Sequence, residues 1–319
     1  MIAGLALAVA AAVLAVIAPR WLGRLAAPHR HPRIALAAWV TSQCVFVGVV
    51  AAIPVVLWVR PGGRWHVLPA ATLTCMQSLR ETGALPWLAA VEAVLCTVGL
   101  AVTARTVLVV ARRLLRHRRL TESHASALRL IAGPSATDGE GVFRLGGADF
   151  AAYSIGGRSP AIVLGTAVAA LDPDARAAVL AHERAHLTGR HHLLVAWSDA
   201  LRAALPGVPL AYRGATWTRV LVELSADRQA AVSCGSGAVC AALGHSAAAG
   251  RDARPAALSV SGTGLAADRM AWLSAVQVPR SGAQALHYPV AVTVSVLPVL
   301  ASTSVVVAAL ALFCAVFGG

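Results

Sequence analysis

A short run near the middle of the chain, LAHERAHLTG (180–189), contains His182, Glu183 and His186 in the spacing HExxH. On a helix the two histidines stand at positions i and i+4, so both imidazoles project from one face and can hold one metal ion. The carboxylate of Glu183 lies beside them and is free to act as a general base on a water molecule that the metal activates. The pattern therefore predicts a metal-dependent hydrolase, although chance would produce it in roughly one chain of this composition in a hundred.

The residues around the motif have the signals of a helix with defined ends. Asp172 can cap the free N–H groups of the first turn, and Pro173 suits the first helical position. Gly189 is a common residue type at a helix exit. These signals place the motif on a predicted helix within residues 171–189.

A metal site of this kind needs a third protein ligand, and the best candidate is Glu223 in the helical stretch TWTRVLVELSADRQAAVSCG (216–235). Asp227 lies one turn further along the same face, where a carboxylate could orient a ligating histidine. The alternative is a solvated acidic edge in which Glu223 and Asp227 pair with Arg219 and Arg228.

These two stretches carry a resemblance to a known family. The run SPAIVLGTAVAALDPDARAAVLAHERAHLTGRHHLL (159–194), followed by ELSAD (223–227), resembles the gluzincin membrane metallopeptidases. The likeness is greatest to the BlaR/MecR-like antibiotic-sensing peptidases, which are related to the CAAX prenyl endopeptidase-like membrane metallopeptidases. The family often has an acidic residue soon after the motif, where this chain has His191 and His192, so no role is carried over to these two residues.

The resemblance implies a zinc endopeptidase with one Zn²⁺ per chain, held by His182, His186 and Glu223. It also implies Glu183 as the catalytic base, with Asp227 in support. The implied substrate is a protein, for which a cytoplasmic winged-helix transcriptional repressor is a candidate, and self-cleavage is a further option. The alternative function is a non-catalytic membrane signalling scaffold with a structural or vestigial metal site.

The composition predicts an integral membrane protein. Hydrophobic residues make up 58% of the 319 residues and charged residues only 13%, with a mean hydropathy of +0.70. The formal net charge is +13, but the arginines cluster at the ends of apolar runs, where they would meet anionic lipid headgroups. Without interleaved aromatic residues or a known motif, we expect no direct binding of nucleic acid.

Four apolar runs are long enough to cross a bilayer core, which takes about 20 helical residues. They cover residues 2–18, 34–59, 87–110 and 290–316. The first run has no basic segment ahead of it, so we interpret it as a retained span and not as a signal peptide. Arginine-rich stretches follow the first and third runs, which places these stretches in the cytoplasm and both termini outside the cell membrane.

The predicted fold class is therefore a mainly α membrane protein with four transmembrane helices and an α+β peptidase domain between the third and fourth. The first three helices are expected within residues 1–112, the cytoplasmic metallopeptidase domain within 113–285 and the fourth helix within 286–319. The resemblance implies that the peptidase domain has a zincin-like fold. Short strands are predicted at LRLIAG (128–133), GVFRL (141–145), FAAYSI (150–155) and AIVLG (161–165). Either Tyr153–Gly157 or Ala161–Gly165 could be an edge that pairs with an extended substrate, with ordinary sheet packing as the alternative.

Several further expectations concern single segments and side chains. We expect a buried or interfacial helix at His191–Leu210, because Asp199 and Arg202 disfavour a spanning one. Residues 236–285 should be loosely ordered apart from a helix around Leu265–Val276. Arg105 should extend to the cytoplasmic headgroups. The candidates for an oxyanion-stabilising side chain are His191, His192, Tyr212 and His245.

Overall fold

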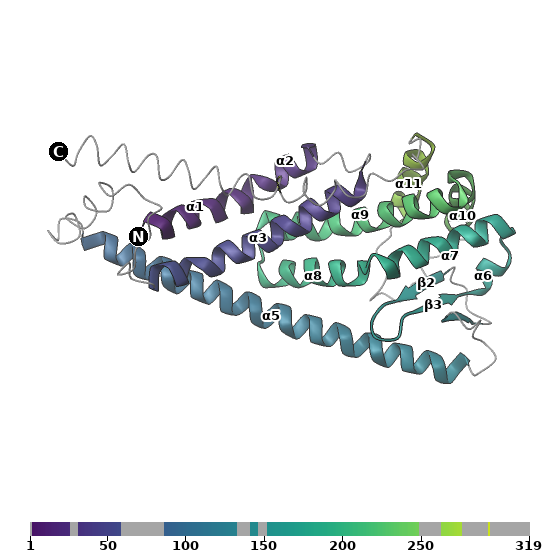
Figure 1. The fold of residues 1–319 in the computed structure, drawn as a ribbon, viewed down its shortest axis with the longest axis horizontal. Coiled ribbons are helices and arrows are strands. Elements are labelled where there is room, and N and C mark those ends of the chain that lie inside the picture. Colours follow the sequence, from purple (N-terminus) through teal and green to yellow (C-terminus); the bar gives the residue numbers. More distant parts are fainter. Residues whose placement is uncertain are drawn as a thin grey trace.

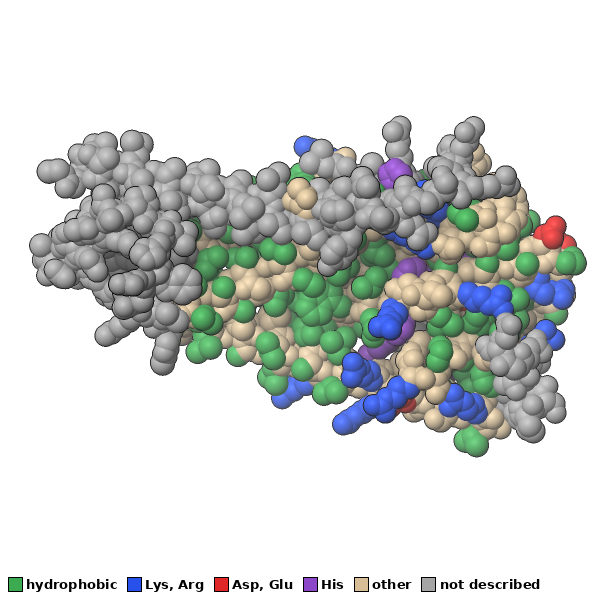
Figure 2. All heavy atoms as spheres, in the orientation of Figure 1, with side chains coloured by type: hydrophobic (Ala, Val, Ile, Leu, Met, Phe, Trp, Pro, Cys, Tyr) green, Lys and Arg blue, Asp and Glu red, His purple; other side chains and the backbone are tan. Residues whose placement is uncertain are grey.

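The computed structural model describes residues 2–25, 31–58, 86–132, 141–145, 152–248, 263–275 and 293. These residues form a mainly helical, elongated molecule with one three-stranded sheet (Figure 1). The longest helix runs along one side and connects a bundle of apolar helices at one end to the sheet at the other. Apolar side chains cover the middle of the molecule, and arginines gather toward the end that carries the sheet (Figure 2).

The bundle begins with α1 (Ile2–Val16), α2 (Ala18–Leu25), α3 (Pro32–Trp58) and α5 (Pro86–Ala132). By length and composition α3 and α5 can each cross a membrane, and α1 with α2, bent by 46°, can form a third span. The part of the chain that the structure describes thus supports two or three of the four predicted spans. The predicted fourth, 290–316, lies outside the described residues except for Thr293.

Helix α5 extends far beyond the predicted third span. Its 47 residues correspond to about 70 Å, more than twice the thickness of a bilayer core. The prediction of a strand at residues 128–133 is wrong, because Leu128–Ala132 form the last turn of this helix. The apolar residue Leu128 in this turn is explained by its packing against Phe143 and Tyr153 of the sheet.

The sheet consists of β1 (Val142–Arg144), β2 (Ala152–Ile155) and β3 (Ala161–Leu164) in the order β1-β3-β2. β3 is parallel to β1 and antiparallel to β2, with Tyr153 opposite Val163. Alternate residues face opposite sides, so Val163 packs toward α5, whereas Ile162 packs toward α6 (Thr166–Ala169) and α7 (Pro173–Thr188). The other three predicted strands are confirmed, and β2 and β3 form an antiparallel hairpin. Because β3 is central, the prediction that Ala161–Gly165 could be a free edge is wrong, and β1 and β2 are the outer strands of the sheet that the described residues form.

Two helices, α8 (His191–Ala204) and α9 (Pro209–Cys234), form a hairpin that packs against α3 and α5 (Figure 1). Its apolar side chains share one core with those of the bundle, including Leu201, Leu210 and Trp39. The expectation of a buried helix after His191 is therefore confirmed. The expectation for Arg105 is wrong, because its Nε donates to the carbonyl oxygen of Ala204 at 2.7 Å, where the C-terminal end of α8 needs donors.

Neutral polar groups are buried between the hairpin and α3. Ser198 Oγ donates to Gln43 Oε1 at 3.1 Å and lies 3.0 Å from Thr218 Oγ1. Gly214 allows this approach, because a Cβ at that position would lie 2.0 Å from Gln43 Nε2. The hairpin thus fits closely into the apolar bundle.

The remaining helices are α10 (Ser236–Ala248) and α11 (Thr263–Ala275). α10 contradicts the expectation of loose order after Ser236, since it packs on α7 and α9 through Val239 and Ala242. α11 confirms the helix predicted around Leu265–Val276. Its Trp272 and Leu273 complete a small core with Ala178 of α7 and Leu224 of α9.

Candidate metal centre

Helix α7 presents the HExxH side chains toward α9. Its first turn is fixed by Asp172, whose side chain accepts a hydrogen bond from the backbone N–H of Ala175 at 2.8 Å, and Pro173 is the first helical residue. His182 and Glu183 are buried, and His186 is partly buried. The small residue Ala178 lets α7 approach α9 closely.

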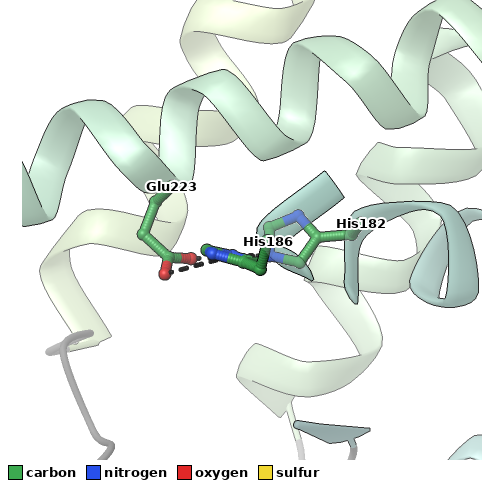
Figure 3. A group of neighbouring side chains, drawn as sticks. All are labelled: His182, His186 and Glu223. Carbon is green, nitrogen blue, oxygen red and sulfur yellow. Dashed lines mark hydrogen bonds and ion pairs between the residues drawn. The ribbon is translucent and has the colours of Figure 1, made fainter. Parts of the chain in front are cut away.

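Helix α9 brings Glu223 to the two histidines, as Figure 3 shows. The Nε2 atoms of His182 and His186 lie 3.0 Å apart, and each is 3.6 Å from a carboxylate oxygen of Glu223. One ligand atom from each residue falls within 4.8 Å of the others. Among the described residues, His182, His186 and Glu223 form the group of potential ligands that could hold a metal ion.

These distances fit a tetrahedral ion. Zinc bonds of about 2.0–2.1 Å place neighbouring ligand atoms roughly 3.3 Å apart. The two Nε2 atoms are 3.0 Å apart, and His182 and His186 lie 3.6 Å from Oε2 and Oε1 of Glu223, respectively, so each separation is close to that value. Glu223 Oε2 is buried and accepts no hydrogen bond of good geometry, although Arg269 Nη1 lies 3.1 Å from it, so the carboxylate keeps a lone pair that a cation could use.

Asp227 orients His182 from the side opposite the cluster. Its Oδ1 lies 2.9 Å from His182 Nδ1, so this nitrogen donates the hydrogen bond and the lone pair of the neutral ring is on Nε2. His191 Nδ1 lies 3.0 Å from His186 Nδ1, so one of these two ring nitrogens donates a hydrogen bond to the other. Both candidate ligands thus have a partner on Nδ1 and direct Nε2 toward Glu223.

Arg269 of α11 is the residue of the site that sequence reasoning missed. Its Nε and Nη2 donate to Asp227 Oδ2 and Oδ1, each at 2.6 Å, and its Nη1 forms an ion pair with Glu223 Oε2 at 3.1 Å. The interpretation of Glu223 and Asp227 as a solvated edge paired with Arg219 and Arg228 is wrong, because both carboxylates are buried. The available signal was an arginine on the apolar face of α11, one turn from Trp272 and Leu273.

The charges of the cluster change the pKa values of its members. Burial would lower the pKa of His182, but hydrogen bonds and charges of Asp227 and Glu223 raise it to about 9. Burial would raise the pKa of Glu223 and of Asp227, yet Arg269 and the histidines hold both below their usual range. Burial lowers the pKa of His191 to about 3, so its ring is neutral. Without a metal ion His182 is thus protonated and offsets part of the negative charge of Glu223 and Asp227, and a cation bound at Nε2 would take the place of that proton.

The four oxyanion candidates lie at different places. The prediction that Tyr212 could be the oxyanion group is wrong, because Tyr212 lies 11 residues before Glu223 on α9, about 16 Å away along the helix axis. Its ring contacts Arg202 instead. His192 stacks on His117, with ring centroids 6.1 Å apart. His191 lies behind His186, and His245 is exposed on α10. Within the described residues, the structure thus favours none of the four as the oxyanion group.

Comparison with known proteins gives one match. The sequence model described as Peptidase family M48 matches residues 145–237, which include β2, β3 and α7 to α9. No curated protein and no solved structure matches the chain. The matched segment contains His182, Glu183, His186 and Glu223, and peptidases of family M48 are metal-dependent. The matched segment is thus similar to an M48 metallopeptidase domain, and the two or three candidate membrane helices suggest that it is membrane-associated.

Proposed function

We propose that this chain is a membrane-anchored zinc endopeptidase. His182, His186 and Glu223 are the zinc ligands, Glu183 is the general base, and Asp227 orients His182. The observation that carries the proposal is the convergence of the two Nε2 atoms and the Glu223 carboxylate at 3.0–3.6 Å, with a partner on each Nδ1. Zinc bound at this position supplies a Lewis acid that lowers the pKa of a water molecule toward about 7.

The protein's own groups perform the proton transfers. Glu183 follows His182 directly on α7 and is buried, so its carboxylate is close to the ligands without being one of them. It takes the proton of the attacking water and delivers it to the amine that leaves when the peptide bond breaks. Arg269 interacts electrostatically with Glu183 as well as with Asp227 and Glu223, so one guanidinium faces all three carboxyl groups.

Within the described residues β2 pairs with β3 on one side only, and its other edge supports a peptide substrate. β2 packs on α7, and the residue after it, Gly156, lies against His192 at the start of α8. An extended substrate that adds to β2 would thus run beside the HExxH helix, held by backbone hydrogen bonds that any peptide can form. This arrangement favours cleavage within a chain over removal of single terminal residues.

The site lies at the end of a membrane helix. Arg33, in the first turn of α3, donates to Ser225 Oγ at 3.4 Å and to Gln229 Oε1 at 2.6 Å, two and six residues after Glu223. We propose that this end faces the cytoplasm and that both termini lie outside, as the arginine distribution predicts. A substrate at the inner membrane surface follows from this position. A cytoplasmic winged-helix repressor, as in BlaR/MecR-like signalling, is the partner that we propose to test first.

The decisive experiment compares Glu183→Gln with the wild type, both purified in detergent with zinc. We expect one zinc per chain in each protein and a loss of cleavage of a denatured substrate by about 10²–10⁴-fold in the variant, because the base is removed and the ligands are kept. Glu122→Gln on the exposed surface of α5 is the matched control and should cleave like the wild type.

Two outcomes would contradict the proposal. Cleavage retained by Glu183→Gln would show that another group is the base. One tightly bound zinc per wild-type chain, without cleavage of denatured protein or repressor under any condition, would favour a signalling scaffold with a structural metal.

A further inference from the structure

A groove of about 560 Å³ lies between α2 and the first two turns of α9, away from the metal centre. Three arginines line it, together with a threonine and two aromatic residues: Arg20, Arg24, Arg213, Thr216, Tyr212 and Trp217. All three arginines are exposed, and no carboxylate is among the lining residues. The α2–α9 groove is therefore strongly cationic.

The groove lies at the depth of a membrane surface. Trp217 stacks on Trp39 of α3, with ring centroids 6.4 Å apart. At the far end of the bundle Gly4 of α1 contacts Leu57 of α3. Leu57 and Trp39 are 18 residues apart on one helix, which is about 27 Å, close to the thickness of a bilayer hydrocarbon core. Tyr212 and Trp217 thus stand where aromatic residues gather in membrane proteins.

An apolar surface leads from the bilayer into the groove. Leu5, Val9 and Val16 are exposed on one face of α1, with relative exposures of 43%, 38% and 43%. Arg20 follows one turn after Val16, and its Nη1 donates to the Val16 carbonyl oxygen at 3.1 Å. A molecule with a hydrocarbon tail along α1 would place its polar end among the arginines.

We propose that the α2–α9 groove binds the phosphodiester headgroup of an anionic phospholipid. Guanidinium groups suit phosphate oxygens, because their N–H donors are planar and paired. The hydroxyl of Thr216 also lines the groove and donates a long hydrogen bond of 3.4 Å to the Tyr212 carbonyl oxygen. Arg202 lies 4.8 Å from the centre of the Tyr212 ring and holds it at the edge of the groove. A free phosphate ion would use the arginines but not the apolar face of α1. The arginines and the apolar face of α1 together therefore fit a lipid better than a free ion.

The test measures lipid binding to the full chain in a non-ionic detergent by native mass spectrometry and thermal melting. We expect phosphatidylglycerol to bind and to raise the melting temperature, and phosphatidylcholine to do so much less. The triple variant Arg20→Gln, Arg24→Gln, Arg213→Gln should bind phosphatidylglycerol on the order of 10–100-fold more weakly. The single variant Arg24→Gln, at an exposed position that cannot disturb the core, should weaken binding by about threefold to tenfold.

The matched control removes three positive charges from a surface outside the groove. Arg116→Gln, Arg118→Gln, Arg119→Gln takes three exposed arginines from α5 and should bind phosphatidylglycerol like the wild type. Equal binding by both triple variants, or equal binding of the two lipids, would overturn the proposal. Soluble glycerol phosphate or an acidic peptide that displaces the lipid at micromolar concentration would also overturn it, since the groove would then be a site for a soluble anion or an acidic protein.

Discussion

The two halves of α9 use opposite kinds of polar contact. The first half packs inside the apolar bundle, where the buried contacts among Thr218, Ser198 and Gln43 are neutral, and its ion pair of Arg219 with Asp199 is partly exposed. The second half contains Glu223 and Asp227, which are buried among His182 and Arg269, most of them charged. Only five residues, about 8 Å of helix, separate Thr218 from Glu223. One continuous helix therefore joins the apolar bundle to the charged candidate metal site.

The difference has an energetic consequence. A neutral hydrogen bond contributes about 1 kcal/mol, and removing it leaves a modest penalty. Buried charged groups are stable only when opposite charges pair with each other, so removing one group leaves its partner buried without a counter-charge, which costs several kcal/mol. We therefore expect substitutions in the second half to have large effects on metal binding and stability, and substitutions in the first half to have small ones.

The largest effect should follow from Glu223→Gln. The amide keeps the shape of the side chain but removes the anionic ligand, so we expect zinc affinity to fall by more than about 100-fold and peptide cleavage to fall with it. Competition with a chelating dye measures the affinity. Thr218→Val, in the neutral half, should leave zinc affinity unchanged within about threefold. A Glu223→Gln protein that binds zinc like the wild type would show that Glu223 is not a ligand.

Sequence patterns were sufficient for the parts of this site that depend on local spacing. His182 and His186 share a face because of helical geometry, and Glu223 and Asp227 lie one turn apart for the same reason. The structure brings these two pairs together, as expected for a metal site. Arg269 was missed because it meets Asp227 across 42 residues, and an isolated helix pattern does not indicate its partner.

The errors in the predicted fold have related causes. The run at 128–133 is apolar and short, so periodicity alone did not distinguish a strand from the end of a long helix. Arg105 was interpreted from its own helix, whereas its hydrogen-bond acceptor is on α8, 99 residues later. The sequence could predict that α8 is buried, but the packing of the α8–α9 hairpin against α3 and α5 depends on side-chain fit between distant segments.

The second effect concerns stability. Arg269→Met should destabilise the metal-free protein by about 3–5 kcal/mol, because Asp227 and Glu223 would remain buried without their arginine. Thermal or denaturant unfolding in the presence of a chelator measures this change. Arg219→Met removes the partner of Asp199, where both side chains are about 30% exposed, so it should cost less than about 1 kcal/mol.

Zinc provides an internal check on this comparison. A bound dication would replace part of the missing positive charge, so added zinc should stabilise Arg269→Met by more than it stabilises the wild type. The same zinc should stabilise Arg219→Met and the wild type equally, because Asp199 and Arg219 lie outside the cluster. Equal destabilisation by the two substitutions would show that burial does not distinguish the two ion pairs.

The smallest effect should follow from Ser198→Ala. This change removes the hydroxyl between Gln43 and Thr218 and should cost about 1–2 kcal/mol of stability, measured by unfolding in detergent. Zinc affinity should stay within about threefold of the wild type, because α9 keeps its apolar contacts through Leu210 and Leu221. If the affinity instead fell tenfold, the neutral contacts would be setting the position of Glu223 relative to α7. The anchor and the catalytic site would then have to be treated as one cooperative unit, and the division of α9 into two independent halves would fail.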